Sequence, residues 1–453
     1  MYDVIVVGAG VSGLLCSGAL AQKGLSVLVL EKSPPVYGKL GGRLSSFDLH
    51  PGYVVDWGMH ALRFGKEGVH GKNLKEMRIT TELIDYGPGR MYYDGKMFDL
   101  GYLDFKSPPP EGIVSDQARK EIVNLKTELS KLDDTQYVNI SVTDLLDQLN
   151  MQVSTEAQWL FSRLIDPFIG PGWRLREISA GEVIWMIKEA FKVNSSIAYP
   201  KGGFKAIWDE IEQRVVSQKG EVRCNTPVDR VLVKDKKVEG VLAKGEEIRA
   251  STVVVTLPCF EYFSVLDEKN FPADFVFKCR NQVLACISMV DMGLRKVVEP
   301  EAAFVIEPGS VASSFSPSWG SFTSNVDPST APHGEQLFQY WCAFMAGGYY
   351  GTLARTSALM SKTLEPEIEN FYYGLYPEMK KNVKWRRPFS GFTHGSIPTP
   401  DQARNRRPAQ RSPHVKGLYF AGDTTSTPGA AGDIAWLSGP MCAKAILEDR
   451  NRR

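Results

Sequence analysis

The chain begins with Met1-Tyr-Asp-Val-Ile-Val-Val7, an apolar run that leads directly into Gly8-Ala-Gly10-Val-Ser-Gly13. Residues 14–23, rich in Leu and Ala, predict a helix. A second apolar run, Ser26-Val-Leu-Val-Leu30, ends at Glu31. This order predicts a buried strand, a tight glycine turn, a helix and a second strand, which together begin a parallel α/β sheet of the kind that binds dinucleotides.

Each glycine of the turn has a separate physical role. Gly8 permits the turn, Gly10 lets backbone N–H groups approach a pyrophosphate, and Gly13 lets the helix pack closely on the strand. The start of the helix, at Ser12, presents unpaired N–H groups and the positive end of the helix dipole to the phosphates. Glu31 is placed to accept hydrogen bonds from a ribose diol. We therefore expect an adenine dinucleotide here; the alternative is a glycine-rich turn without a ligand.

The composition excludes several other classes of protein. The chain has 453 residues, with 43% hydrophobic and 23% charged residues, as is usual for soluble globular proteins. The net charge of +1 offers no electrostatic attraction to nucleic acid. The seven cysteines and six histidines are scattered, which favours reduced thiols and no metal site. No apolar stretch reaches the roughly 18 residues of a membrane span, and the N-terminus lacks a basic leader, so we expect a cytoplasmic protein.

Several further motifs follow the glycine turn in a defined order. They are Gly41-Gly42-Arg43, Asp56-Trp-Gly58-Met59-His60, Tyr199-Pro-Lys-Gly-Gly203, Val228 within a strand, Thr252 to Pro258, and Leu418-Tyr-Phe-Ala-Gly422-Asp423. In this order they resemble the FAD-dependent superfamily of flavin amine oxidases, protoporphyrinogen oxidases and phytoene desaturase-type enzymes, and are most similar to the desaturase-like branch. The resemblance covers the two ends and the middle of the chain.

The resemblance implies an α/β fold with two domains. A discontinuous, Rossmann-like FAD-binding domain would comprise residues 1–65, 199–259 and 411–453. Strand patterns that recur at 220–258 and 417–423, far from the N-terminus, independently indicate such a discontinuous sheet. A mixed α+β substrate domain, a helical insertion plus a sheet, would comprise residues 66–198 and 260–410.

The resemblance also assigns roles around the phosphates and the adenosine. Gly8, Gly10, Ser12 and Gly13 would hold the pyrophosphate of FAD, and Glu31 with Lys32 would lie at the adenosine ribose. Val228 would pair its backbone with the adenine. Arg43, beside Gly42, would bring a planar cation to the phosphates or the flavin edge; an ordinary surface cation is the alternative.

The remaining implied roles lie around the flavin ring. Gly58, Met59 and His60 would pass close to the isoalloxazine. Gly422 and Asp423 would contact the ribityl chain or the pyrophosphate, although Asp423 would also suit a turn cap. The helix that contains Ile434 and Ala435 would point its N-terminus at the flavin pyrimidine.

One departure from the superfamily pattern counts against amine oxidation as the reaction. Amine oxidases place an aromatic residue nine positions after the acid of the terminal motif, and here that residue is Gly432. We therefore expect a FAD-dependent oxidoreductase that removes a hydride from a carbon of an apolar or cyclic substrate, as desaturases and dehydrogenases do. The alternatives are a FAD-dependent amine or protoporphyrinogen oxidase, a non-redox isomerase of the carotenoid type, and a flavin-free lipid-binding escort protein.

The partners follow from the same reasoning. We expect a small, hydrophobic substrate, and oxygen, a quinone or another carrier as electron acceptor, because no second fingerprint suggests an NAD(P) site. No catalytic base is evident: His60, Lys201 and Lys278 are weak candidates, and a structural histidine and solvated lysines are the alternatives.

Two surface and interior predictions remain. The aromatic stretches 338–344 and 371–373 would line an apolar tunnel or form plain core. The basic stretch 404–411 and the tail 450–453 would allow peripheral membrane contact or be a solvated loop and a frayed end.

Overall fold

A five-stranded parallel sheet lies at the centre of the computed structural model, which describes residues 2–34, 40–58, 60–169, 174–309, 318–346 and 350–452. Its strand order is β10-β2-β1-β14-β20. The strands are β1 (Val4–Val7), β2 (Val27–Leu30), β10 (Glu221–Arg223), β14 (Val253–Val255) and β20 (Leu418–Phe420). All four neighbouring pairs run parallel, so segments more than 400 residues apart contribute to one sheet.

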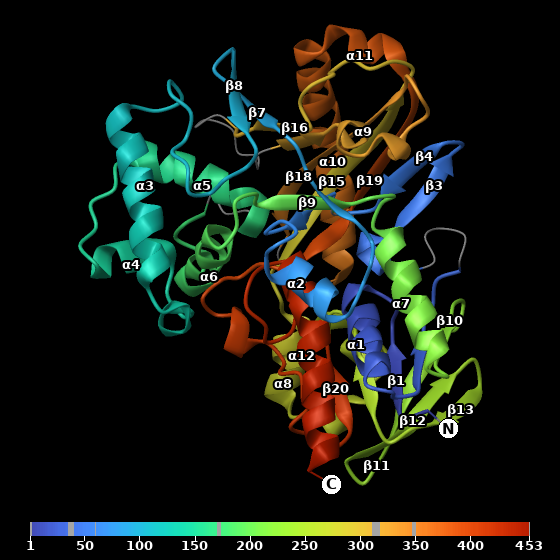
Figure 1. The fold of residues 1–453 in the computed structure, drawn as a ribbon. Helices are drawn as coiled ribbons and strands as arrows, with labels where there is room; N and C mark the ends of the chain where they lie inside the picture. The colour runs from blue at the N-terminus through green and yellow to red at the C-terminus, as the bar shows by residue number, and fades with distance from the viewer. Residues whose placement is uncertain are drawn as a thin grey trace.

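The alternation of side chains along β1 explains what covers the two faces of this sheet. Val4 and Val6 belong to a core shared with helices, whereas Ile5 and Val7 belong to a core shared with a second sheet. Figure 1 shows the helices side by side: α1 (Val11–Gln22), α7 (Lys205–Ser217) and α12 (Gly432–Asn451). The second sheet is antiparallel: β11 (Val228–Lys234), β12 (Lys237–Ala243) and β13 (Glu246–Arg249).

The second sheet corrects part of the sequence prediction. The strands predicted within 220–258 all suited the parallel sheet, but only β10 and β14 join it among the described residues. β11 and β12 form a hairpin, with Val231, Val238 and Val241 buried and charged residues exposed between them. This half-exposed pattern fits a layer that lies on the parallel sheet rather than a strand buried inside it.

A helical lobe lies to one side of the sheet, at the left of Figure 1. It contains α3 (Asp116–Lys131), α4 (Val142–Gln148), α5 (Thr155–Ile169) and α6 (Ala180–Phe191), which share one apolar core. Ser141 caps α4, because its hydroxyl accepts the N–H of Asp144 and the Asp144 carboxylate accepts the N–H of Ser141.

A seven-stranded mixed sheet forms the upper part of Figure 1, in the order β19-β15-β18-β17-β16-β7-β8. Its strands are β7 (Gly89–Tyr93), β8 (Lys96–Gly101), β15 (Leu284–Leu294), β16 (Phe304–Glu307), β17 (Ser318–Ser321), β18 (Gln336–Ala346) and β19 (Val383–Ser396). Helices α10 (Tyr350–Leu375) and α11 (Pro377–Asn382) lie beside it. The parallel pair β7–β16 joins the two predicted insertions into one sheet.

Shorter elements connect these layers. The strands are β3 (Ser46–His50), β4 (Tyr53–Asp56), β5 (Leu62–Arg63), β6 (Leu83–Asp85) and β9 (Ile197–Pro200). The short helices are α2 (Val69–Glu76), α8 (Ala273–Arg280), α9 (Thr323–Val326), η1 (Gly42–Leu44), η2 (Asp134–Tyr137), η3 (Cys259–Ser264), η4 (Glu268–Asn270), η5 (Pro328–Thr330) and η6 (Arg404–Arg406).

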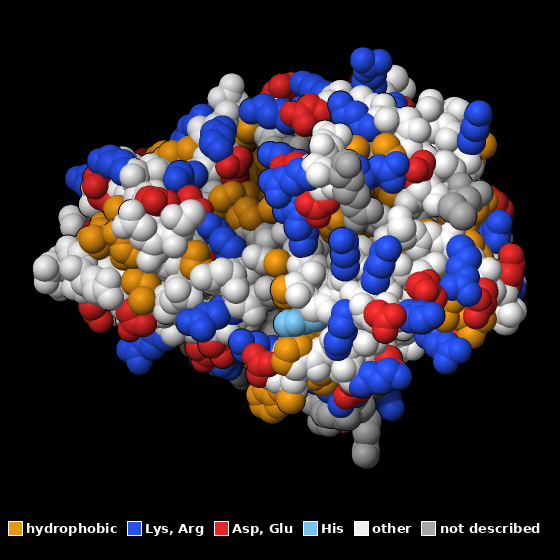
Figure 2. Space-filling view, turned by 90° about the horizontal axis from the view of Figure 1, so that it is seen from below, with side chains coloured by type: hydrophobic (Ala, Val, Ile, Leu, Met, Phe, Trp, Pro, Cys, Tyr) orange, Lys and Arg blue, Asp and Glu red, His pale blue; other side chains and the backbone are white. Residues whose placement is uncertain are grey.

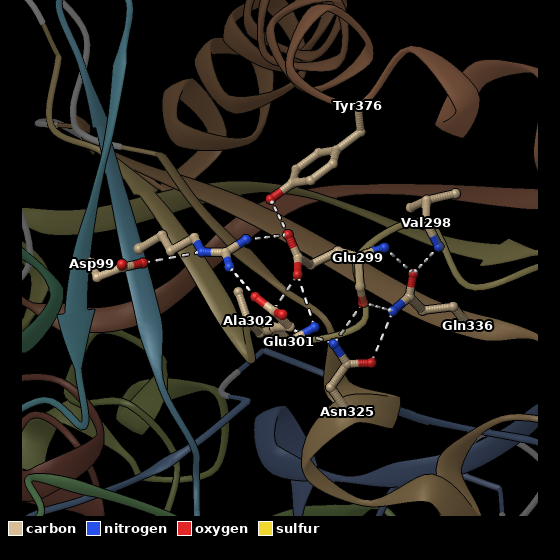
Figure 3. Close-up of polar contacts among 9 residues, drawn as sticks. Asp99, Val298, Glu299, Glu301, Ala302, Asn325, Gln336 and Tyr376 are labelled. Atoms are coloured by element: carbon tan, nitrogen blue, oxygen red, sulfur yellow. Dashed lines mark hydrogen bonds and ion pairs between the residues drawn. The ribbon is translucent and has the colours of Figure 1, made fainter.

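A buried carboxylate fixes the junction between β7, β16 and α10. Figure 3 shows Glu299 accepting hydrogen bonds from Arg90 at 2.8 Å and from the Tyr376 hydroxyl at 3.1 Å. Its second oxygen accepts the N–H groups of Glu301 and Ala302 at 2.9 and 3.0 Å. Glu299 is 4% exposed, so these four donors replace the water that a carboxylate otherwise requires.

We expect Glu299→Gln to lower the free energy of unfolding by about 2 kcal/mol, because it removes the buried negative charge that Arg90 faces. Urea unfolding followed by circular dichroism measures this. Glu301→Gln is the matched control, since Glu301 pairs with the same arginine but its side chain is 74% exposed, and we expect a change within about 0.5 kcal/mol. Equal losses in the two variants would contradict the assignment.

Candidate active site

A cavity of about 550 Å³ lies at the carboxyl ends of the parallel strands. The residues that follow β1, β2, β14 and β20 all line it: Gly8, Glu31, Thr256 and Gly422. In open parallel α/β sheets this edge is where ligands bind, because the strand ends and the helix N-termini point the same way.

The glycine turn is shaped so that one side of it is open to the cavity. Gly8 has φ +104°, and a Cβ on Gly13 would overlap the carbonyl oxygen of Gly8. The Thr256 hydroxyl fixes the turn by donating to the carbonyl of Val7 at 2.8 Å. A Cβ on Gly10, in contrast, would meet no protein atom within 4 Å. Gly13 therefore serves packing, whereas Gly10 leaves space for a ligand.

Glu31 is fixed by backbone N–H groups. Its Oε2 accepts the N–H of Ala9 at 2.8 Å, and its Oε1 accepts the N–H of Ser33 at 2.8 Å. The carboxylate therefore lies against the glycine turn and lines the cavity.

An ion pair lines the cavity next to the glycine turn, where the N–H of Gly41 donates to the carbonyl of Ala9 at 2.9 Å. Arg43 Nη2 lies 2.6 Å from Asp423 Oδ2, and Arg43 follows two glycines with positive φ angles, Gly41 and Gly42. Arg43 Nη1 and Asp423 Oδ1 are buried and have no hydrogen-bond partner among the described residues. A buried donor and a buried acceptor left without partners each cost about 1–3 kcal/mol, so they favour a ligand with complementary groups.

The N-terminus of α12 meets that of α1 at the cavity. The Ser12 hydroxyl donates to the carbonyl of Ala435 at 2.9 Å, and the Ser438 hydroxyl accepts the N–H of Gly422 at 2.9 Å. Gly439 allows this approach, because a Cβ there would crowd the carbonyl of Ser12. Two positive helix ends therefore face the same space.

Arg63, which the sequence prediction missed, holds the segment that leads into α12. Its guanidinium donates to the carbonyl of Ala430 at 2.6 Å and to that of Phe168, and it pairs with Asp433 at 3.0 Å. His70 also lies 2.9 Å from Asp433. Arg63 lines the cavity and is 6% exposed, but no sequence motif marks it, since its partners are backbone carbonyls from distant segments.

The Tyr199-Pro-Lys-Gly-Gly203 motif supports the turn that carries Gly58 and His60. The buried Asp56 accepts the Tyr199 hydroxyl, the Ser46 hydroxyl and, at 3.3 Å, the N–H of Phe204. Burial raises the pKa of Asp56 to about 6 even with these donors. Gly203, with φ +83°, brings the motif close to Asp56.

Aromatic side chains form the other half of the cavity. They are Trp57, Tyr86, Phe168, Trp319, Trp341 and Trp436, with Ile197 and Ile287 beside them. The Tyr86 hydroxyl and the Trp319 indole N–H both donate to the Ser321 hydroxyl at 2.9 Å, so their polar atoms are satisfied. This half presents apolar ring surface to whatever enters it.

His60 is the exception within the apolar half. It is 3% exposed and lines the cavity, and neither ring nitrogen has a partner among the described residues. Burial, aided by the positive charge of Arg387, lowers its pKa to about 3. The imidazole is therefore neutral at physiological pH.

The structure brings together most of the predicted cofactor residues. Those that line the cavity are Gly8, Gly10, Ser12, Glu31, Lys32, Gly42, Arg43, Gly58, His60, Gly422, Asp423 and Ala435. Gly13 and Ile434 do not line it, and Met59 lies outside the described residues. Val228 does not line it either, because it begins β11 and pairs with Ala243 in the other layer.

Other candidates have structural roles. Lys201 is exposed and pairs with Glu82 at 3.0 Å, and Lys278 is exposed on α8, so neither reaches the cavity. Of the aromatic stretches, Trp341 lines the cavity, whereas Phe338 and Tyr372 pack in the core between the seven-stranded sheet and α10. Of the two alternatives for these rings, an apolar tunnel or plain core, the structure therefore supports plain core.

The basic stretch is less available than its sequence suggested. Arg404 pairs with Asp134 at 2.7 Å and Glu182 at 3.0 Å, and Arg407 is 4% exposed. Arg411 pairs with two acidic side chains of α12. Figure 2 shows the lower face of the molecule, where Lys and Arg side chains gather around a central hollow with Asp and Glu side chains among them.

The described ranges contain neither a cluster of metal ligands nor a membrane-spanning helix. No three His, Cys, Asp or Glu side chains there lie close enough together to hold a metal ion. None of the helices in these ranges has both the length and the apolar content that crossing a membrane requires.

The sequence pattern of the family described as flavin containing amine oxidoreductase matches residues 11–447. This chain belongs to that family. The match spans every segment that builds the cavity except the end of β1 and the first glycines of the turn. Family membership confirms FAD as the predicted cofactor and the superfamily resemblance as a whole.

Individual relatives are distant but extend over the whole chain. Prolycopene isomerase 1 of an Oncidium hybrid cultivar is 24% identical over 99% of this chain and 84% of its own length. The 4,4'-diapophytoene desaturase of Staphylococcus haemolyticus is 23% identical over 98% and 99%. The structure of cyclohexylamine oxidase from Brevibacterium oxydans superimposes with a TM-score of 0.70 at 16% identity, covering 99% of each chain, and so supports the α/β fold.

The cavity has the features that FAD requires. Phosphate oxygens suit the two helix N-termini and the unpaired Nη1 of Arg43, and a hydroxyl suits the unpaired Oδ1 of Asp423. The open side of Gly10 gives the backbone room to approach a pyrophosphate.

We expect Gly10→Ala to lower the affinity for FAD at least tenfold while the protein still folds, because the added methyl enters the ligand space and meets no protein atom. The measurement is flavin absorbance retained after gel filtration, with circular dichroism as the fold check. Gly374→Ala is the control, since a Cβ on this helical residue of α10 also meets nothing; it should keep its FAD. Full retention of FAD by Gly10→Ala would contradict the phosphate site.

The lowered pKa of His60 predicts a dependence of stability on pH. Below pH 6.5 the unfolded chain binds a proton at His60 that the folded chain does not bind, so the free energy of unfolding falls as the pH falls. At pH 5 the loss is about 2 kcal/mol relative to pH 7. We expect His60→Gln to remove this part of the loss, as measured by urea unfolding of both proteins at the two pH values. An unchanged difference between pH 7 and pH 5 would show that His60 titrates normally.

Proposed function

We propose that this chain is a FAD-dependent oxidoreductase that removes a hydride from a carbon of an apolar or cyclic substrate, in the manner of desaturases and dehydrogenases. The observation that carries the proposal is that one continuous cavity has two parts. The dinucleotide cradle consists of the glycine turn, Glu31 and Arg43, and the aromatic wall consists of the aromatic side chains named above. FAD, when bound, supplies the redox chemistry as the hydride acceptor. The division into domains at 1–65, 199–259 and 411–453 against 66–198 and 260–410 forms part of this proposal.

The protein residues bind, orient and exclude water. The glycine turn and Arg43 would hold the phosphates, and Glu31 would hold the ribose. The aromatic side chains would hold a flat substrate in one orientation and exclude water from it. A fixed orientation lowers the entropic part of the activation free energy. Electrons would then leave to oxygen, a quinone or another carrier.

The charge distribution favours an uncharged substrate over an amine. The acidic residues in the described lining of the cavity are Glu31, Glu261 and Asp423, and all three follow strands of the parallel sheet, whereas the aromatic residues of the lining bring no carboxylate. Gly432 lines the cavity where amine oxidases carry an aromatic residue. The Tyr86 hydroxyl donates to Ser321, and Arg63 is a permanent cation paired with Asp433, so neither serves as a base.

A second candidate is a non-redox isomerase of the carotenoid type. The similarity to prolycopene isomerase over 99% of the chain supports it. The two reactions differ in the mass of the product, because dehydrogenation removes two hydrogens and isomerisation removes none.

We expect purified protein supplied with FAD to be yellow, and its absorbance to bleach anaerobically when an oxidisable polyene or cyclic alkene is added but not when a primary amine is added. Heat-inactivated protein with the same FAD is the control. Bleaching by amines would favour the amine oxidase alternative, and a polyene product of unchanged mass would favour the isomerase. A protein that stays colourless with FAD would refute both reactions and favour the escort protein.

A further inference from the structure

His60 is a buried polar side chain that lines the cavity and makes no hydrogen bond with its ring nitrogens among the described residues. It lies in the turn between β4 and β5, and Gly58, which packs on the carbonyl of Arg43, fixes where this turn enters the cavity. Tyr86 and Trp319 satisfy their polar atoms through Ser321, and Trp436 leaves only its single indole N–H without a partner among the described residues. His60 alone among them combines 3% exposure with two ring nitrogens that lack a partner.

Such an arrangement costs free energy unless a ligand completes it. A neutral imidazole has one N–H donor and one nitrogen acceptor, and leaving either unsatisfied in a buried site costs about 1–3 kcal/mol. A phenylalanine at this position would fill a similar volume without that cost. The retained imidazole therefore indicates a hydrogen-bonding partner that arrives with the ligand.

The charges nearby define that partner. Arg387 lies close enough to disfavour a positive charge on His60, and Arg63 is a second cation at the cavity wall. Arg387 pairs with Asp291, and Arg63 pairs with Asp433, so neither carboxylate is free to pair with a cationic group brought to His60. An uncharged oxygen, in a carbonyl or hydroxyl group, matches a neutral imidazole without adding charge to a desolvated site.

We propose that His60 is a specificity-determining residue that hydrogen-bonds an uncharged oxygen of the substrate. The substrate is then an apolar skeleton that carries a carbonyl or hydroxyl group, rather than a pure hydrocarbon. This inference rests on the proposed function, because it takes the aromatic half of the cavity as the substrate site.

The test compares two ligands that differ only at this oxygen. β-Ionone, an apolar ring with an enone, and its analogue with a methylene in place of the carbonyl oxygen are titrated calorimetrically into FAD-loaded protein under anaerobic conditions. We expect the wild type to bind the ketone about five- to tenfold more tightly, as one neutral hydrogen bond provides. His60→Phe should abolish this preference by weakening only the ketone, and His60→Gln should retain part of it. Trp341→Phe, which changes the aromatic wall, should weaken both ligands alike.

Each contrary outcome identifies what failed. A wild type without ketone preference, including one that binds neither ligand, would overturn the inference, as would a preference that survives His60→Phe. If His60→Phe instead loses its FAD, the imidazole serves the cofactor and the inference is also wrong. FAD loading of the wild type is measured first, so colourless protein refutes the proposed function, whereas yellow protein without ketone preference refutes only the role of His60.

Discussion

The common carboxyl edge of the parallel sheet is the constraint on which the site depends. Because β1, β2, β14 and β20 run parallel, the residues after each strand meet in one place although they come from three parts of the chain. The helices that follow β1 and β20 direct their N-termini to the same edge. One sheet thus places a glycine turn, a carboxylate for a ribose and two positive helix ends at the same edge, because its strands are parallel.

The remaining half of the cavity is attached to this edge by buried polar contacts. Asp56 links the turn at His60 to the segment at Tyr199, and Arg63 links the entry of α12 to the helical lobe through the carbonyl of Phe168. Both side chains are almost fully buried and bonded to several partners, which makes the loss of any one partner costly. These contacts hold the aromatic wall at a fixed distance from the dinucleotide cradle.

The residues of the dinucleotide cradle could be predicted from short sequence patterns, whereas those of the aromatic wall could not. Gly8, Gly13 and Glu31 are constrained by backbone geometry within about thirty residues, and such constraints leave a readable spacing. Trp319, Trp341 and Arg63 face the cavity only because strands of the mixed sheet and distant carbonyls place them there. An apolar or charged residue in such a position looks the same in sequence as one in the core or on the surface. For this reason the sequence left both a tunnel and the core open for Phe338, which lies in the core.

The hydrogen bond from Ser12 to Ala435 joins residues that are 423 positions apart, so it cannot form until the chain is almost completely synthesised. While the ribosome is still making the middle of the chain, β1 and α1 have emerged but α12 and β20 do not yet exist. Until then, the apolar faces of β1 and β2 that later pack in the sheet stay exposed. Arg43 also lacks its partner Asp423, and the N-terminus of α12 is not yet beside the glycine turn. FAD therefore binds only after the C-terminal segment has been synthesised. Chains truncated before residue 435 should not be stabilised by FAD and should need chaperones to stay soluble.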